Sequence, residues 1–274
     1  WQDPAMVRHI LAHADAQGFA RDDRWSPGIA LEPRVTRPST LPIDPKIAAI
    51  VGRASVGALL EEEEIATLFS ARETDLEHIC DSADALREQV MGDEITYVVN
   101  RNINYTNICA YKCSFCAFSK GDKAEALRGN PYDLDVEEVI RRTREAWQRG
   151  GTEVCLHGGI HPHYTGETYI NLAKAVRAAV PDMHIHGFSP LEVSQGAATL
   201  GLSVEQFLIR LKEAGLDTLP GTAAEILDDE VRAQICPDKL STDQWLDVIE
   251  TAHRVGFTTT ATIMFGHVDT PRHW

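Results

Sequence analysis

Short runs of β-favouring residues alternate with amphipathic stretches from about residue 94 to the end of the chain. Strands are expected at five runs, 95–99, 153–156, 183–188, 218–219 and 259–265. Helices are expected between them. The first begins at 135 and ends at the glycine pair 150–151, the second ends near the proline at 181, and the others cover 203–214 and 241–255. This alternation is typical of βα units around a parallel sheet. Five successive units predict an α/β fold, a TIM-like (β/α) barrel, better than a short doubly wound sheet.

Polar residues mark the starts of these helices. Asp135 is followed by Glu138, and Ser203 by Gln206, which is the spacing of a capping box. Gly150 follows the first of these helices, and glycine suits the left-handed turn that ends a helix. The helix boundaries in the barrel region are therefore well marked.

The region before the barrel divides into two parts. Residues 1–45 carry a short helical pattern and five prolines in their second half, which predicts the tail of a preceding domain plus a Pro-rich linker. Residues 46–93 have apolar positions at helical spacing and are expected to form a helical lead-in. The barrel is expected over 94–274, incomplete because the chain stops after about the fifth strand, with the remaining units beyond Trp274.

Composition and charge narrow the range of partners. The chain is 43% hydrophobic and 24% charged, as expected for a folded protein with a sizeable core. Its formal net charge of −15 disfavours nucleic acid, whose binding depends on neutralising phosphates. No run of about 18 to 20 apolar residues is present, so a membrane span is not expected. We expect a cytoplasmic protein.

Three of the six cysteines fall within eight residues, in the loop after the first expected strand. Cys109, Cys113 and Cys116 form a C-x3-C-x2-C pattern. Three thiolates can bind three irons of a [4Fe-4S] cubane and leave the fourth open to a substrate or cofactor. A structural zinc site is the alternative, but such sites usually take four protein ligands in two spaced pairs. The active sites of (β/α) barrels lie at the C-terminal ends of the strands, which is where this loop is expected.

With an aromatic residue, Phe115, before its last cysteine, the motif resembles the cluster motif of the radical S-adenosylmethionine (SAM) family. The resemblance implies a radical SAM barrel that holds a [4Fe-4S] cluster on these cysteines. It also implies that the open iron binds the amino and carboxylate groups of SAM. One electron from the cluster would then cleave SAM to a 5′-deoxyadenosyl radical.

The loop after the second expected strand contains Gly158 and Gly159. It resembles the glycine pair that radical SAM enzymes use to meet the methionine amino group of SAM, although Ile160 stands where a glutamate commonly follows. Glycine allows such a close approach because it has no side chain. Glu225 lies in a family-like segment, and the resemblance implies that its carboxylate accepts hydrogen bonds from the SAM ribose.

The sequence Gly-Gly-Ile-His-Pro at 158–162 resembles the branch of the family that contains FO synthase and two radical enzymes of futalosine-dependent menaquinone synthesis. Further agreement lies in three segments, 100–107, 221–227 and 235–239. The segments 186–193 and 195–201 and the tail at 1–45 favour the second radical SAM module of the fused FO synthase family. A futalosine-pathway enzyme is the alternative in the same class, and a zinc-stabilised binding module is the alternative in another.

The resemblance to FO synthase implies a transferase of deazaflavin (coenzyme F-420 precursor) biosynthesis. It would cleave L-tyrosine and transfer the 4-hydroxybenzyl group to 5-amino-6-(D-ribitylamino)uracil. It also implies an electron donor such as ferredoxin or flavodoxin, and a first radical SAM module in the same chain. The residues of the substrate pocket are not identified by sequence.

Three histidines stand near the glycine pair. His157, His161 and His163 lie in a Gly/Pro-rich segment with no adjacent pair of carboxylates. We therefore expect loop-forming or substrate-facing roles for them rather than metal ligation.

Overall fold

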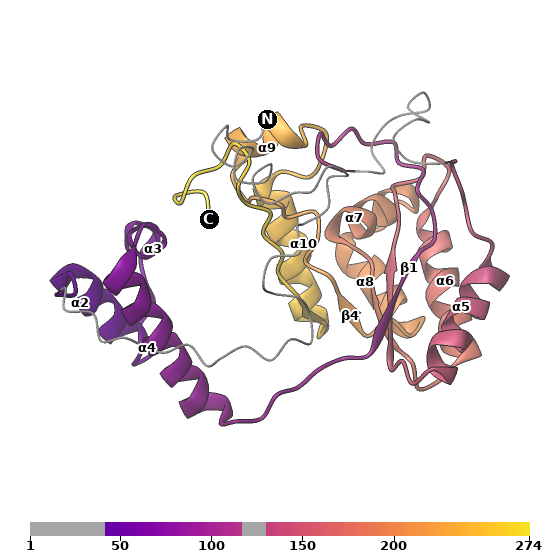
Figure 1. Ribbon diagram of the computed structural model, residues 1–274. Coiled ribbons are helices and arrows are strands. Elements are labelled where there is room, and N and C mark those ends of the chain that lie inside the picture. The colour runs from indigo at the N-terminus through magenta and orange to yellow at the C-terminus, as the bar shows by residue number, and fades with distance from the viewer. Residues whose placement is uncertain (1–41, 117–129) are drawn as a thin grey trace, which may run out of the picture. The chain divides into compact units, whose positions relative to one another are not determined.

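The computed structural model describes residues 42–116 and 130–274, which form parts of two compact units. Unit 1 comprises the chain up to Ile95 together with Phe265–Trp274, and unit 2 comprises Thr96–Met264 (Figure 1). Of the tail and linker expected at 1–45, residues 1–41 lie outside the described residues. Within the described residues, no helix is long and apolar enough to cross a membrane.

Unit 1 contains three helices among its described residues, α2 (Pro45–Ala54), α3 (Glu62–Phe69) and α4 (Glu73–Met91). Helix α2 begins with Pro45 at its first turn, and the Asp44 side chain accepts a hydrogen bond from the backbone of Lys46. Proline suits this position because the first backbone N–H groups of a helix have no partner within it. The core of the unit consists of Ile47, Val51 and Ala71.

Unit 2 is a parallel sheet with the strand order β1-β2-β3-β4-β5. Its strands are β1 (Asn100–Asn104), β2 (Glu153–His157), β3 (His184–Gly187), β4 (Thr218–Leu219) and β5 (Thr258–Thr259). Its helices are α5 (Val136–Gln148), α6 (Gly166–Ala179), α7 (Pro190–Thr199), α8 (Val204–Glu213), α9 (Asp229–Ile235) and α10 (Thr242–Val255). Within the described part of the chain the sheet does not close on itself. This topology confirms the α/β class and the expected series of βα units.

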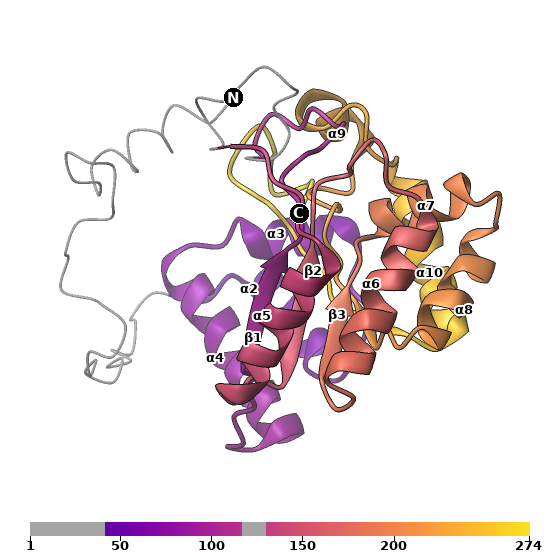
Figure 2. The ribbon, with the colours of Figure 1, turned by 90° about the vertical axis from the view of Figure 1, so that its right-hand side faces the viewer.

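Helices cover the outer face of the sheet, and Figure 2 shows α5 and α6 in front of the strands. Outward-facing strand residues such as Ile103, Val154 and Ile185 are fully buried beneath these helices. Side chains alternate across each strand, so the residues between them face the inside of the sheet. Several of those inward residues are polar, which is unusual for a buried parallel sheet and indicates a site.

The sequence marked most helix boundaries correctly. Asp135 caps α5, Ser203 caps α8 and Ser241 caps α10, each by accepting a hydrogen bond from a backbone N–H three residues on. Gly150 has a φ of +85° after α5, the left-handed conformation that was expected. The second, third and fourth strands lie where the sequence placed them.

The first strand was placed wrongly. The apolar run expected at 95–99 is largely exposed, with Tyr97 at 84%, and the strand begins at Asn100. Its register pairs Asn100 with Glu153 and Asn104 with His157. The asparagines of β1 face the inside of the sheet, whereas Ile103 faces the core and Arg101 bonds to Glu145 of α5, so a polar-looking segment forms the strand.

The fifth strand is also shorter than expected. It covers Thr258–Thr259 rather than 259–265. Helix α7, which lies between β3 and β4, and helix α9, which lies between β4 and β5, were not expected from the sequence. Their short lengths, ten and seven residues, leave little helical periodicity to read.

Candidate active site

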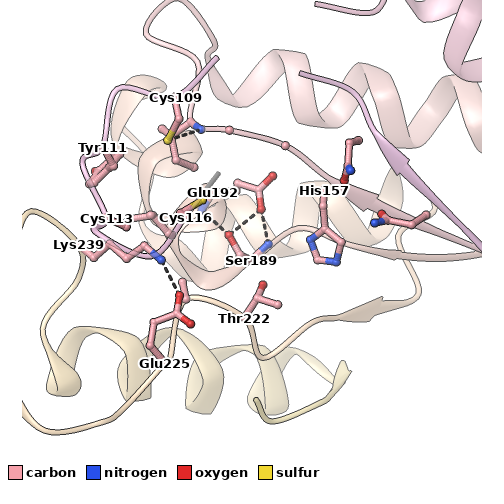
Figure 3. A pocket seen from close by; sticks show the side chains of 17 residues that line it. Cys109, Tyr111, Cys113, Cys116, His157, Ser189, Glu192, Thr222, Glu225 and Lys239 are labelled. Carbon is pink, nitrogen blue, oxygen red and sulfur yellow. Dashed lines mark hydrogen bonds and ion pairs between the residues drawn. The ribbon is translucent and has the colours of Figure 1, made fainter. Parts of the chain in front are cut away.

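A cavity of about 390 Å³ lies in unit 2 where the strands end (Figure 3). Loops after four strands contribute to it, and Lys239 follows α9. The lining residues are Asn102, Asn104, Cys109, Tyr111, Cys113, Cys116, His157, Gly158, Gly159, Ile160, Ser189, Leu191, Glu192, Thr222, Ala223, Glu225 and Lys239. This position, at the C-terminal ends of the strands, is where (β/α) barrels carry their active sites.

All three clustered cysteines line this cavity. Burial raises the pKa of the Cys109 thiol, and it raises that of Cys113 to about 12. Without a metal, Cys113 is therefore protonated at neutral pH, and metal binding there must release a proton. Among the described residues, no three His, Cys, Asp or Glu side chains are grouped tightly enough for a single metal ion. A cubane binds each thiolate on a different iron, so its ligands lie farther apart than the ligands of a single metal ion.

The cysteine loop is held by two neighbouring segments. On one side, Ala110 N donates a hydrogen bond to Ile160 O at 2.9 Å, and Ile160 N donates one to Cys109 Sγ at 3.4 Å. On the other side, Ser114 N donates to Ile235 O at 2.9 Å. Hydrogen bonds to these two segments thus hold both halves of the loop that carries the cysteines.

The glycine pair packs directly against the cysteine loop. A Cβ at Gly158 would overlap the ring of Tyr105, and one at Gly159 would overlap Ile108 O and come within 2.9 Å of Cys109 Cβ. No side chain other than hydrogen fits at either position. Glycine is therefore required at both positions by the packing against Tyr105 and the cysteine loop, and both residues line the cavity.

Glu225 and Lys239 form an ion pair at the cavity wall. Lys239 Nζ lies 2.6 Å from Glu225 Oε1, and the two side chains are 11% and 12% exposed. Burial acts to lower the pKa of Lys239, but the Glu225 carboxylate raises it, and the net pKa lies above its usual value, so the cation persists. The same ammonium lies 5.4 Å from the centre of the Phe115 ring, which is a cation–π distance.

The backbone around Glu225 is strained. Ala223 and Glu225 have φ values of +65° and +53°, in the left-handed region that favours glycine. The guanidinium of Arg232, which is 3% exposed, donates to the carbonyl groups of Ala223, Ala224, Ile226 and Leu240 and holds this loop. Strain of this kind persists where the surroundings enforce it, as they commonly do at functional sites.

One buried hydroxyl in the cavity has no partner among the described residues. Thr222 Oγ1 is fully buried and makes no hydrogen bond there, although the backbone carbonyl of Thr222 accepts one from Trp245 Nε1 at 3.1 Å. An unpaired buried hydroxyl is destabilising. A bound ligand can relieve this cost by supplying the missing partner.

The structure brings together most of the residues that the sequence singled out. Cys109, Cys113, Cys116, Gly158, Gly159 and Glu225 all line the cavity. Phe115 does not line it but lies against Lys239. Of the histidines, His157 lines it, whereas His161 stacks on Tyr164 at 4.7 Å.

The family follows from this constellation and from the sequence comparison. A family model described as the Radical SAM superfamily matches residues 103–274. The chain belongs to the radical SAM superfamily. As a superfamily member it uses a [4Fe-4S] cluster and SAM. The lining of the cavity fits these cofactors. It has three thiols, two glycines without side chains and the Thr222 hydroxyl, which has no partner among the described residues.

This radical SAM chain is similar to several curated proteins. It is 50% identical over 215 residues to FO synthase of Mycobacterium leprae, which covers 78% of this chain and 24% of that protein. It is 46% identical over 289 residues to FO synthase of Streptomyces avermitilis, covering 100% of this chain and 33% of that protein.

A third relative is the 5-amino-6-(D-ribitylamino)uracil–L-tyrosine 4-hydroxyphenyl transferase of Methanothermobacter thermautotrophicus. It is 48% identical over 214 residues, which cover 78% of this chain and 57% of that protein. The chain therefore spans a quarter to a third of the FO synthases and just over half of the transferase.

Solved radical SAM structures share the fold at low identity. Methylornithine synthase (PylB) superposes with a TM-score of 0.63 at 19% identity, over 82% of this chain and 61% of that one. The FeFe-hydrogenase maturase HydG from Carboxydothermus hydrogenoformans gives a TM-score of 0.64 at 21% identity, over 83% and 50%. These likenesses support the fold alone.

Sequence reasoning missed a buried polar group in this radical SAM site. The carboxylate of Glu192 accepts hydrogen bonds from the Tyr105 hydroxyl and from Ser189 N and Oγ, the last two at 2.6 Å. Burial raises the pKa of Glu192, and its three hydrogen bonds act against that rise. Ser189 and Glu192 have capping-box spacing, which was the available signal. Lys239 lies in the family-like segment 235–239, but a single lysine in a loop gives no sign of its role.

Proposed function

We propose that this chain is the tyrosine-cleaving module of an FO synthase. The Cα–Cβ bond of L-tyrosine would break, the 4-hydroxybenzyl group would join C5 of 5-amino-6-(D-ribitylamino)uracil, and the remainder of tyrosine would leave as 2-iminoacetate. The observation that carries this proposal is the 48% identity to a protein of that transferase name over 78% of the chain.

The roles of the cavity residues follow from their chemistry. Cys109, Cys113 and Cys116 would hold three irons of the cluster. When bound, the cluster and SAM together supply a 5′-deoxyadenosyl radical. Gly158 and Gly159 would meet the amino group of SAM through the backbone.

Three further residues would complete the cofactor site. Glu225 would accept hydrogen bonds from the ribose hydroxyls of SAM, and its carboxylate is already held in place by Lys239. Phe115 would support the cluster loop from beneath the Lys239 ammonium. The Lys239 cation would offset part of the negative charge of the thiolates, because it lies close enough to lower the pKa of Cys113 against the effect of burial.

The reaction further requires an electron donor, and we propose a reduced ferredoxin or flavodoxin in the cytoplasm. We also propose that a first radical SAM module precedes this one, as the length of the FO synthase relatives suggests. That module would close the deazaflavin ring.

The test is a reaction of the full-length protein, reconstituted with iron and sulfide under anaerobic conditions. With reductant, SAM, tyrosine and the diaminouracil, we expect 5′-deoxyadenosine and an adduct that contains the tyrosine side chain. A Cys116→Ala variant serves as the matched control and should form neither. An active cluster that makes no tyrosine-dependent adduct would overturn the proposal, and stimulation by a purine-bearing or chorismate-derived compound would favour the futalosine alternative. A purified protein with zinc but neither iron nor sulfide would indicate a binding module.

A further inference from the structure

The two ends of the cavity differ in charge. The cysteines, Glu225 and Lys239 lie at one end, on loops. The other end is formed by Asn102 and Asn104 on β1 and His157 on β2. The register makes Asn104 and His157 direct neighbours, and Asn102 lies two residues back on the same face of β1. This end is polar but carries no charged side chain.

The polar groups at this end are available to a ligand. Within the part of the chain that the structure describes, the side chains of Asn102, Asn104 and His157 make no hydrogen bond. Asn100, which faces the same side one step before them, instead donates to Glu153 at 3.3 Å. Asn100 therefore bonds within the sheet, whereas the side chains of Asn102 and Asn104 are available in the cavity.

His157 behaves as a neutral group. Burial, followed by the nearby His186, lowers its pKa to about 4. A neutral imidazole donates from one ring nitrogen and accepts at the other. In the view of Figure 3, Glu192 and Ser189 lie between the His157 ring and the cysteines Cys109 and Cys113.

This donor and acceptor set suits an uncharged heterocycle better than an amino acid zwitterion. A zwitterion needs a cation and an anion as partners, and this end has neither. A carboxamide presents a donor beside an acceptor in one plane, and it can pair with a ring edge that presents the complementary groups. The imide edge of a uracil offers such a pair. Two asparagines at alternate strand positions, roughly 7 Å apart, can reach the ring and one of its substituents.

We propose that Asn102, Asn104 and His157 form the binding subsite for the diaminouracil acceptor. This inference rests on the proposed function and deepens it by naming the residues that recognise one of the two substrates. The asparagine amides hold the edge of the uracil ring, and the neutral His157 donates to or accepts from one of its exocyclic groups. The acceptor carbon is thereby kept in the same cavity as the cluster loop.

The experiment compares affinities in the full-length, cluster-loaded protein. Asn102→Leu, Asn104→Leu and His157→Leu remove the polar groups, and Asn100→Leu is the matched control on the same strand. Dissociation constants for 5-amino-6-(D-ribitylamino)uracil and for SAM are measured by anaerobic calorimetry without reductant. Tyrosine-dependent formation of 5′-deoxyadenosine is measured separately, without the uracil.

We expect the three variants to weaken uracil binding about tenfold or more, because each loses a hydrogen-bonding partner in a partly buried site. SAM affinity and the tyrosine-dependent reaction should stay within about twofold of the wild type, and Asn100→Leu should leave uracil affinity unchanged. If Asn104→Leu does not fold, Asn104→Asp keeps its size while replacing the donor with a charge, and should show the same selective loss.

Two results would overturn the subsite. One is unchanged uracil affinity in all three variants, and the other is a loss confined to the tyrosine-dependent reaction, which would place tyrosine at this end. A wild-type protein that binds SAM and forms 5′-deoxyadenosine with another substrate, yet does not bind the uracil, would instead refute the proposed function.

Discussion

Lys239 Nζ lies 2.6 Å from Glu225 Oε1, and this pair is nearly enclosed at the wall of the cavity. The partners come from different segments, the loop after β4 and the turn after α9. Glu225 itself has a left-handed backbone conformation, with a φ of +53°. The cation therefore links the loop expected to meet SAM to the loop that carries the cysteines, since it also faces Phe115.

Removing the cation from this pair should destabilise the fold. Lys239→Met leaves the Glu225 carboxylate buried without a counter-ion, and we expect a loss of about 3 kcal/mol in the free energy of unfolding. Chemical denaturation of the metal-free protein at neutral pH measures it. Adding Glu225→Gln should recover most of the loss, because the double variant has no uncompensated charge. Equal stability of the single and double variants would contradict this.

A side chain at Gly159 should disrupt the cluster site. In Gly159→Ala the new methyl group would overlap Ile108 O and displace the loop that carries Cys109. We expect lower iron and sulfide content after reconstitution and SAM affinity weakened by about tenfold or more. Gly52→Ala on α2 is the control, since nothing lies within 4 Å of its added Cβ. It should retain full iron content and gain about 0.5–1 kcal/mol of stability.

Glu192 should make stability depend on pH in an unusual direction. Burial raises its pKa in the folded protein, so the folded state binds more protons than the unfolded state above the ordinary glutamate pKa. The carboxyl's contribution to stability is then fully present below the unfolded pKa and is lost as pH rises through the folded pKa. Glu192→Gln removes this titration and can still bond Tyr105 and Ser189. Wild type should therefore lose stability relative to the variant as pH rises above about 4.5, and a constant difference across pH would refute this.

How much of the site could be predicted depends on whether its residues form local patterns. Cys109, its two partner cysteines and the glycine pair lie in short motifs, and capped helices such as that of Asp135 follow local rules. The position of the first strand was predicted wrongly because residues of β1 line the cavity. Asn102 and Asn104 give β1 a polar pattern, while the apolar run before it is exposed. Lys239 acquires its role only when the fold brings it to Glu225.

Arg232 should be as important for SAM binding as for stability. Its buried guanidinium bonds four carbonyl groups, three of them in the strained loop that carries Glu225. Arg232→Met leaves those carbonyls without their donor, and we expect a loss of about 3 kcal/mol or more. Because the loop that carries Glu225 can then relax, the affinity for SAM should fall as well as the stability. Calorimetric SAM binding below the unfolding temperature separates the two effects, and unchanged affinity in a destabilised but folded variant would show that the loop does not need the arginine.

The Thr222 hydroxyl offers a case in which stability and ligand binding should move in opposite directions. It is buried and unpaired within the described residues, so the ligand-free protein bears the cost of a hydroxyl without a partner. Thr222→Val keeps the shape of the side chain and removes that cost, so we expect the ligand-free protein to gain about 1 kcal/mol in its free energy of unfolding. If SAM or the substrate supplies the missing partner, the same variant should bind that ligand about tenfold more weakly. Thermal unfolding with and without each ligand measures both effects, and a variant that is less stable without ligand would show that the hydroxyl already has a partner, such as an ordered water.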